Sequence, residues 1–333
     1  MANPANAALY SHRSQMLLEN ATTGSEIAVD RVQSFDPSFN IRTDPYYELA
    51  RKGKIGSTQH PPEYRIGIEQ NMTDSMEFEF VLAGKSLTAG NRSYNAGDLL
   101  TYSDNLTAWL LTLNNADTVM NELQISNCSV AELNYRFTVG GAMTQGVTLV
   151  GRTGKLYTAN TPHAAFGALD DTSLGGIHGK DARVWFSTGS IVADRGFRLQ
   201  NFNIRVAYPT VYVRELGNRN LAGTLADSPD VSADFDILVA DEQPTEKFFT
   251  DEGDYFDYAN PVTAFDMVIR VYDPTGTEGT TIIKKFKVEN VLPVAHTPIR
   301  AQVRGLSTAR YSLVMSKETT ANSGGLIVGN YDF

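Results

Sequence analysis

Two stretches of the chain decide the fold, because they are copies of one pattern. Residues 32–62 read VQSFDPSFNIRTDPYYELARKGKIGSTQHPP, and residues 199–229 read LQNFNIRVAYPTVYVRELGNRNLAGTLADSP. The two stretches align without a gap, so that each position of the first has one counterpart in the second. Their identical pairs are Gln33/Gln200, Phe35/Phe202, Thr43/Thr210, Glu48/Glu215, Leu49/Leu216, Gly56/Gly223 and Pro62/Pro229. An internal repeat of this kind indicates a duplicated structural unit.

The similarity continues in the same order on both sides of these stretches. The further matches are TGS (23–25) with TGS (188–190), TAW (107–109) with TAF (263–265), and TQGVTLV (144–150) with TARYSLV (308–314). The order predicts two modules with flanking segments. We divide the chain into an N-terminal arm (1–19), a first module (20–151), a linker or excursion (152–184), a second module (185–316) and a C-terminal tail (317–333).

Each module has the sequence pattern of antiparallel β-strands. In AFDMVIRVYD (264–273), apolar residues alternate with mostly polar ones, which is typical of a half-buried strand. Similar runs separated by turn residues, without intervening amphipathic helices, indicate a sandwich or a barrel. We therefore predict a mainly β protein with two tandem antiparallel β-sandwich or barrel modules. Each module is expected to hold at most one short helix. In the second copy it would follow Pro244, whereas the matching residues 76–82 (MEFEFVL) alternate like a strand.

Composition places the chain among globular proteins, with 42% hydrophobic and 20% charged residues in a length of 333. No apolar stretch is long enough to cross a bilayer, and the N-terminus lacks a signal-peptide profile, so we expect no membrane association. The single cysteine, Cys128, cannot form an internal disulfide. A net charge of −10 argues against general affinity for the nucleic-acid backbone.

No pattern in the sequence points to catalysis. The five histidines are scattered without metal-ligand spacing, and Cys128 has no basic neighbour in sequence to activate its thiol. Residues 151–155 (GRTGK) miss the register of a phosphate-binding loop and read as a turn between strands. We therefore expect no enzymatic activity, no metal and no cofactor. Residues 284–287 (KKFK) are predicted to form an exposed strand face, and Trp185 to lie in the core.

The negative charge is concentrated in one band, residues 227–257, with a single base at Lys247. Its acids are Asp227, Asp230, Asp234, Asp236, Asp241, Glu242, Glu246, Asp251, Glu252, Asp254 and Asp257. Three interpretations remain open: a solvated loop and helix face, a calcium site near residues 251–257, or an electrostatically repulsive wall. The calcium interpretation lacks the EF-hand pattern.

The chain resembles bacteriophage tail tube proteins in which the tube module is duplicated. The resemblance rests on an opening strand pair in each half, a Glu-Leu…Gly…Pro excursion (48–62 and 215–229), and closing strands that end in TLV or SLV. It covers both modules but not residues 152–184 or the termini. In that family six modules form a ring, so three chains of this kind would complete one, and rings stack into a tube. A head-to-tail contact that closes by rotation gives such a ring and protects strand edges.

The resemblance also implies contacts and partners. The excursions are candidates for contacts between subunits or rings, through Glu48, Leu49, Gly56, Pro62, Glu215, Leu216, Gly223 and Pro229. Implied partners are the chain itself and other tail proteins: baseplate, terminator, tape measure and, in a contractile tail, sheath. The protein would be assembled in the host cytoplasm and reside in the virion tail. DNA would pass through without specific binding.

The acidic band suits a lumen lining in this scheme, through Asp241, Glu242, Asp251, Glu252 and Asp254. Carboxylates on the wall would repel DNA phosphates and let the genome slide. Two alternatives are a baseplate hub or distal tail protein of the same fold, and a two-sandwich carbohydrate-binding or adhesion protein. The adhesin would need exposed aromatics, for which Tyr46, Tyr47, Trp185 and residues 255–258 are the candidates.

Overall fold

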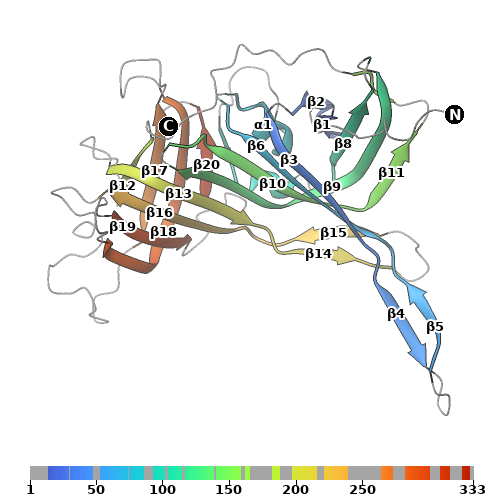
Figure 1. Ribbon diagram of the computed structural model, residues 1–333. Helices are drawn as coiled ribbons and strands as arrows, with labels where there is room; N and C mark the ends of the chain where they lie inside the picture. The colour runs from blue at the N-terminus through green and yellow to red at the C-terminus, as the bar shows by residue number, and fades with distance from the viewer. Residues whose placement is uncertain are drawn as a thin grey trace.

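The computed structural model confirms a mainly β protein built from antiparallel strands (Figure 1). It describes residues 14–29, 31–47, 53–73, 75–85, 93–101, 104–114, 116, 118–138, 140–158, 162–165, 182–187, 197–215, 221–238, 264–272, 282–300, 308–315 and 325–330. None of the helices in these ranges has the length and hydropathy of a membrane span.

The elements follow the duplication, with β1–β11 in the first half and β12–β20 in the second. The first half contains β1 Ser14–Asn20, β2 Ser25–Ala28, β3 Val32–Asn40, β4 Thr43–Tyr47, β5 Lys54–Gln59, β6 Glu63–Asn71, α1 Glu77–Leu82, β7 Ser93–Asn95, α2 Asp98–Thr101, β8 Leu106–Leu113, β9 Val119–Thr138, β10 Thr144–Gly151 and β11 Thr153–Tyr157. The second half contains β12 Ala182–Ser187, β13 Phe197–Ala207, β14 Thr210–Val213, β15 Gly223–Ala226, β16 Asp230–Leu238, β17 Phe265–Tyr272, β18 Ile282–Arg300, β19 Thr308–Met315 and β20 Leu326–Gly329.

The repeated strands follow in the same order in the two halves, in the register that the sequence repeat predicts. Strands β3–β4–β5–β6 correspond to β13–β14–β15–β16. Strands β4 and β14 begin at the repeated threonines Thr43 and Thr210, and β6 and β16 each begin directly after the repeated prolines Pro62 and Pro229. Strands β10 and β19 begin with the matched closing segments, 144–150 and 308–314. The sequence repeat is therefore a repeat of structure.

Each half has two layers that share one long strand. The first part of β9 pairs with β8 and β11, and its second part pairs with β10. In the second half, β18 pairs first with β17 and β20 and then with β19. Both long strands contain an asparagine with left-handed backbone at the matching place, Asn127 (φ 54°) and Asn290 (φ 50°). Asparagine tolerates this conformation better than most residues, so it suits the point where the strand passes between layers.

One hydrophobic core extends through both halves. It includes Tyr135 and Phe137 of β9, Phe202 of β13 and Phe286 of β18, all at most 2% exposed. Trp185 of β12 is 8% exposed and packs with Val268 and Tyr272, which confirms its predicted core position.

Residues 77–82 form a helix, whereas the alternation in 76–82 predicts a strand. Helix α1 buries every residue from Phe78 to Leu82, including Glu79. A run of five consecutive buried residues presents no solvent face, so alternation of residue types cannot report its conformation. Acidic side chains in its first turn favour the helical end electrostatically. The single turn α2 is a second helix in this half, one more than predicted. The residues after Pro244 lie outside the described residues.

Strands also occur in the stretches predicted to be a linker and a tail. Strand β11 and the first residues of β12 fall in 152–184, and β20 falls in 317–333. Strand β20 pairs with β18 and also with β7 of the first half. The module boundaries stay predictions, but these flanking segments contribute strands to the same sheets.

Candidate assembly surfaces

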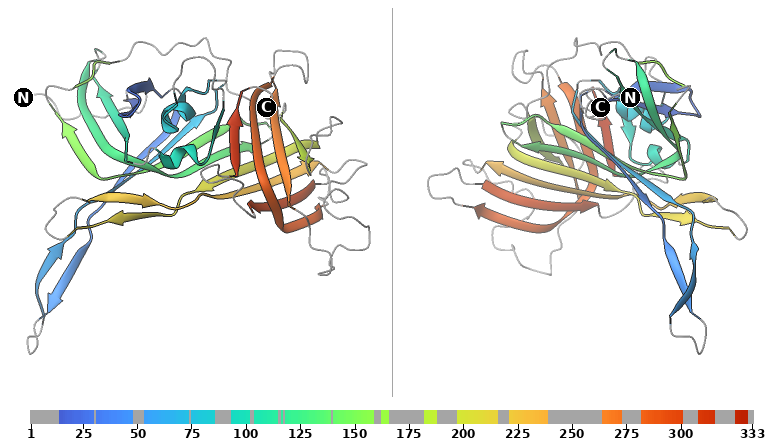
Figure 2. Two further views of the ribbon diagram at one scale, coloured as in Figure 1. Left: turned by 180° about the vertical axis from the view of Figure 1, so that it is seen from behind. Right: turned by 45° about the vertical axis from the view of Figure 1, so that its right-hand side comes forward.

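The two halves are joined by a continuous sheet across β9 and β13, the module seam. The strands pair antiparallel from Asn201 opposite Thr138 to Ala207 opposite Glu132. The connected order β3-β6-β10-β9-β13-β16-β19-β18 therefore contains strands from both halves (Figure 2). On the core side of the seam, the ring centroids of Phe137 and Phe202 lie 5.3 Å apart. The seam thus combines backbone pairing with aromatic packing.

A buried ion pair joins the halves at a second place. Lys284 of β18 donates to Glu79 Oε1 of α1, and its Nζ lies 3.3 Å from Gln145 Oε1. Lys284 and Glu79 are both 0% exposed, and Lys285 is buried as well. The prediction that residues 284–287 form an exposed strand face is therefore wrong for these two lysines. The partners of Lys284 come from the first half, which a local sequence pattern cannot reveal.

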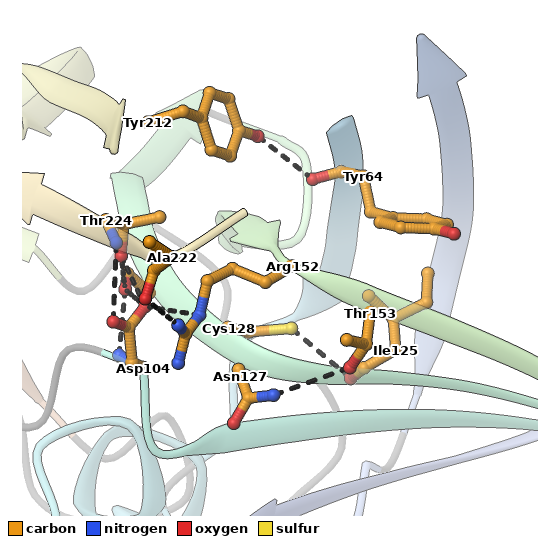
Figure 3. A network of polar contacts seen from close by, with 11 residues as sticks. Tyr64, Asp104, Ile125, Asn127, Cys128, Arg152, Thr153, Tyr212, Ala222 and Thr224 are labelled. Carbon is orange, nitrogen blue, oxygen red and sulfur yellow. Dashed lines mark hydrogen bonds and ion pairs between the residues drawn. The ribbon is translucent and has the colours of Figure 1, made fainter. Parts of the chain in front are cut away.

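The second-half hairpin β14–β15 is seated on the first half by polar contacts centred on Asp104 (Figure 3). The Asp104 carboxylate accepts hydrogen bonds from the Thr224 backbone N–H at 3.3 Å, from the Thr224 hydroxyl and from the Ser129 hydroxyl at 3.2 Å. Arg152 donates to the Ala222 carbonyl, and its Nε lies 3.6 Å from Asp104 Oδ1. Tyr212 donates to the Tyr64 carbonyl at 3.3 Å, and burial raises the pKa of its phenol to about 12.

Replacing Asp104 with alanine is expected to weaken the attachment of the β14–β15 hairpin to the first half. A lost hydrogen bond to a charged group costs about 1.5–3 kcal/mol, so amide exchange in β14–β15 should accelerate by roughly tenfold or more. Hydrogen-exchange mass spectrometry measures it. Asp44→Ala in β4 is the matched control and should leave β14–β15 unaffected. Equal protection of β14–β15 in the Asp104 variant and the wild type would contradict the role of this carboxylate.

The equivalent first-half hairpin, β4–β5, projects away from the body (Figures 1 and 2). Its described polar contacts are local: Asp44 pairs with His60 at 2.6 Å and with Arg42 at 3.0 Å. Hydrogen bonds from His60 and then Arg42 hold the pKa of the Asp44 carboxyl below its usual value. Tyr47 is 66% exposed. The two equivalent hairpins thus differ: β14–β15 packs against the first half, whereas β4–β5 projects from the body.

The predicted excursion residues are divided between these hairpins. Gly56 lies in β5 opposite Tyr46, and Gly223 lies in β15, where a Cβ would come 3.7 Å from Asp104 Oδ2. Pro62 and Pro229 lead into β6 and β16, and Glu215 is exposed after β14. Glu48, Leu49 and Leu216 lie outside the described residues. The sequence missed Asp104, Ser129 and Arg152, because no local motif marks a contact between distant segments.

The face of the joined sheet that points away from the core is polar. Burial alternates along β6, β9, β13 and β16, so every second side chain lies on this face. Its charged members on these strands are Glu63, Arg65, Glu69, Glu132, Arg136, Arg205, Asp230, Asp234 and Asp236. Arg205 donates to Glu132 at 3.0 Å, which lowers the pKa of that carboxyl. The face crosses the seam without interruption.

Among the side chains that the structure describes, strand β16 presents acidic and hydroxyl groups on this face: Asp230, Ser232, Asp234 and Asp236. Asp234 accepts from Ser312, and Asp236 accepts from Asn201. These aspartates belong to the acidic band, and their alternation with buried apolar residues marks one face of a strand. The acids predicted to line a lumen, Asp241, Glu242, Asp251, Glu252 and Asp254, lie outside the described residues.

Other candidate sites have simple outcomes. Cys128 is buried, which raises the pKa of its thiol to about 12 and keeps it protonated, as expected for an inert thiol. Trp185 is buried and unavailable to a sugar, while residues 255–258 lie outside the described ranges. Within those ranges, no three metal-binding side chains gather into a site.

Comparison with solved structures finds 18 similar chains, and one of these covers about half of this protein. It is a chain of the "Cryo-EM structure of the anti-feeding prophage (AFP) baseplate, 6-fold symmetrised", with a TM-score of 0.33 and 10% sequence identity. The match covers 48% of this chain and 100% of that chain. Protein-family models and curated protein sequences give no match.

Proposed function

We propose that the protein is a structural virion protein of a phage-like tail, whose copies join head to tail into rings that stack as a tube. The observation that carries the proposal is the module seam: β9 of one half and β13 of the next form one continuous sheet. A contact that joins unlike edges of equivalent modules can be repeated, and repetition with rotation closes a ring. The resemblance of the sequence to duplicated tail tube proteins points to six modules, and so three chains, in each ring.

The polar sheet face supplies the wall of the proposed channel. The outward side chains of β16 that the structure describes are acidic or hydroxyl, and Arg205, one of three arginines on the face, is engaged by Glu132. The aspartates of β16 would repel DNA phosphates, so the genome would slide rather than bind. The protein's part in delivery is therefore structural, with the other tail proteins as partners.

Electron microscopy of the concentrated protein tests the proposed assembly. We expect rings or short tubes with three chains per turn, because the seam can propagate. Dispersed single chains at high concentration would contradict the proposal. Sugar binding by such single chains would favour the adhesin alternative.

Neutralising the acidic strand is expected to slow DNA passage without preventing assembly. The variant Asp230→Asn/Asp234→Asn/Asp236→Asn keeps polar groups of similar size but removes three charges from the proposed wall, so phosphate repulsion falls. Ejection kinetics of particles carrying the variant measure the effect. Glu26→Gln is the control for the loss of negative charge, because Glu26 is exposed on β2 in the other layer. Unchanged ejection from intact particles would remove this face from the wall.

A further inference from the structure

The module seam pairs one strand of each half, and the duplication predicts a second, equivalent strand pairing that is not made within the single chain. The ladder of the module seam places Asn203 opposite Arg136 and Val206 opposite Leu133. Just beyond it, the Tyr208 backbone N–H donates to the Ala131 carbonyl at 2.9 Å. Val206 and Tyr208 are 0% and 3% exposed. The partner strand thus buries the apolar residues of the β13 edge.

The duplication supplies a counterpart for each strand of the seam. Strand β3 corresponds to β13 in the gapless alignment, and the second part of β18 corresponds to the second part of β9. Among the described strands, β3 pairs with β6 alone, and residues 292–300 of β18 pair with β19 alone. Each therefore has an open edge where its counterpart meets the other half.

Exposed apolar residues mark both open edges. Phe39 and Ile41 are 53% and 55% exposed, although they correspond to the buried Val206 and Tyr208. On the other edge Val294 is 61% exposed. Apolar side chains exposed at one copy of a contact and buried at the other indicate a missing neighbour.

Val294 also corresponds to Ala131 in detail. Both are the extra residue of a bulge: β9 shifts register against β10 between Val130 and Glu132, and β18 shifts against β19 between Pro293 and Ala295. A β-bulge bends its strand and changes the direction of its side chains, so a bulge present in both halves marks equivalent positions. Ala131 receives Tyr208, and the counterpart of Tyr208 is Ile41.

We propose that β3 of one copy pairs antiparallel with the end of β18 in a second copy, in the register of the module seam. This register places Asp36 opposite Arg300 and Phe39 opposite His296, on either side of a second register shift in β18 between Thr297 and Arg300. It directs the Ile41 backbone N–H to the Val294 carbonyl. The register follows from two equivalent residue pairs. Arg136 lies opposite Thr144 in the first half and Arg300 lies opposite Thr308 in the second, so Arg300 takes the place of Arg136. The inference rests on the proposed head-to-tail assembly and names its contact.

Cysteine pairs test this register. Opposed residues of antiparallel strands have Cα atoms about 4.5–5.5 Å apart, which suits a disulfide. Asp36→Cys/Arg300→Cys is expected to give intermolecular disulfides under mild oxidation, seen as a ladder of covalent multimers on non-reducing gels. Asn203→Cys/Arg136→Cys is the matched control within one chain, and it should close inside the monomer. The native Cys128 stays protonated and buried.

A shifted pair makes the test specific. Ser34→Cys/Arg300→Cys moves one thiol two residues along the same strand face, a diagonal of about 7–8 Å that a disulfide spans poorly. Its multimer yield should be roughly tenfold lower. Equal yields from both pairs, or no ladder while the in-chain control closes, would overturn the register. Rings in electron micrographs without a disulfide ladder on gels would reject only the β3–β18 pairing. A disulfide ladder without rings or tubes would reject the proposed function.

Discussion

Lys284→Met is expected to destabilise the protein by about 3–5 kcal/mol, because it leaves the Glu79 carboxylate buried without its partner. Both side chains are 0% exposed, and among the described residues Glu79 Oε2 has no hydrogen-bond partner to compensate. The pair connects β18 of the second half to α1 of the first. Its loss should therefore weaken the junction between the halves as well as overall stability.

Urea unfolding followed by tryptophan fluorescence measures this loss. The double variant Glu79→Leu/Lys284→Met should recover most of it, because replacing both charges by apolar groups removes the uncompensated carboxylate. Lys287→Met is the matched control on the same strand. Its partners Glu289 at 2.7 Å and Asp266 at 3.2 Å are partly exposed, so a cost of up to about 1 kcal/mol is expected. An equal effect of the two single variants would refute the argument.

Phe286→Ala is expected to cost about 3–5 kcal/mol and to leave unfolding as one transition. The Phe286 ring lies 4.8 Å from the ring of Tyr135 in the first half and 5.9 Å from that of Phe202 in the second. Its removal creates a cavity bounded by both halves. Stability should therefore fall for the whole chain rather than for the second half alone.

Two single-tryptophan proteins check this cooperativity. Trp109 reports the first half and Trp185 the second, so Trp185→Phe and Trp109→Phe provide separate probes. The two transitions should coincide and shift together when Phe286→Ala is added. Val268→Ala is the control, because Val268 packs with Trp185 and Tyr272 in a small cluster from the second half alone. Separate transitions would show two independent domains instead of a shared core.

Much of the fold could be predicted from the repeat. The gapless alignment of the two stretches places the starts of β4 and β14, and of β6 and β16, at matching positions. This works because the residues that set strand face and turn position are local, and both copies keep them. Alternation likewise identified the strand that buries Trp185.

Features set by distant contacts could not be predicted. Helix α1 buries every residue from Phe78 to Leu82, so its alternation carried no information about a solvent face. Lys284 and Glu79 look like surface charges until the halves meet. Asp104 has no motif, because its partners Ser129 and Thr224 come from strands far along the chain.

The candidate surfaces were only partly foreseen, for a related reason. The sequence located an acidic band but not which of its members share a sheet face. Asp234 and Asp236 are placed on that face by the pairing of β16 with β13 and β19. The seam itself depends on two strands from different halves, and pairing partners so distant in the chain leave no trace in local periodicity.

The open edges of β3 and β18 belong to different strands, so one edge cannot replace the other. This difference determines how an arc of copies can grow. Under the proposed pairing, two copies cannot satisfy both edges by facing each other, so a short arc always keeps one edge of each kind. The arc ends only when its own ends meet. The angle between the two halves of a single chain would then set the circumference, and a substitution that twists the module seam would change how many chains fit around it.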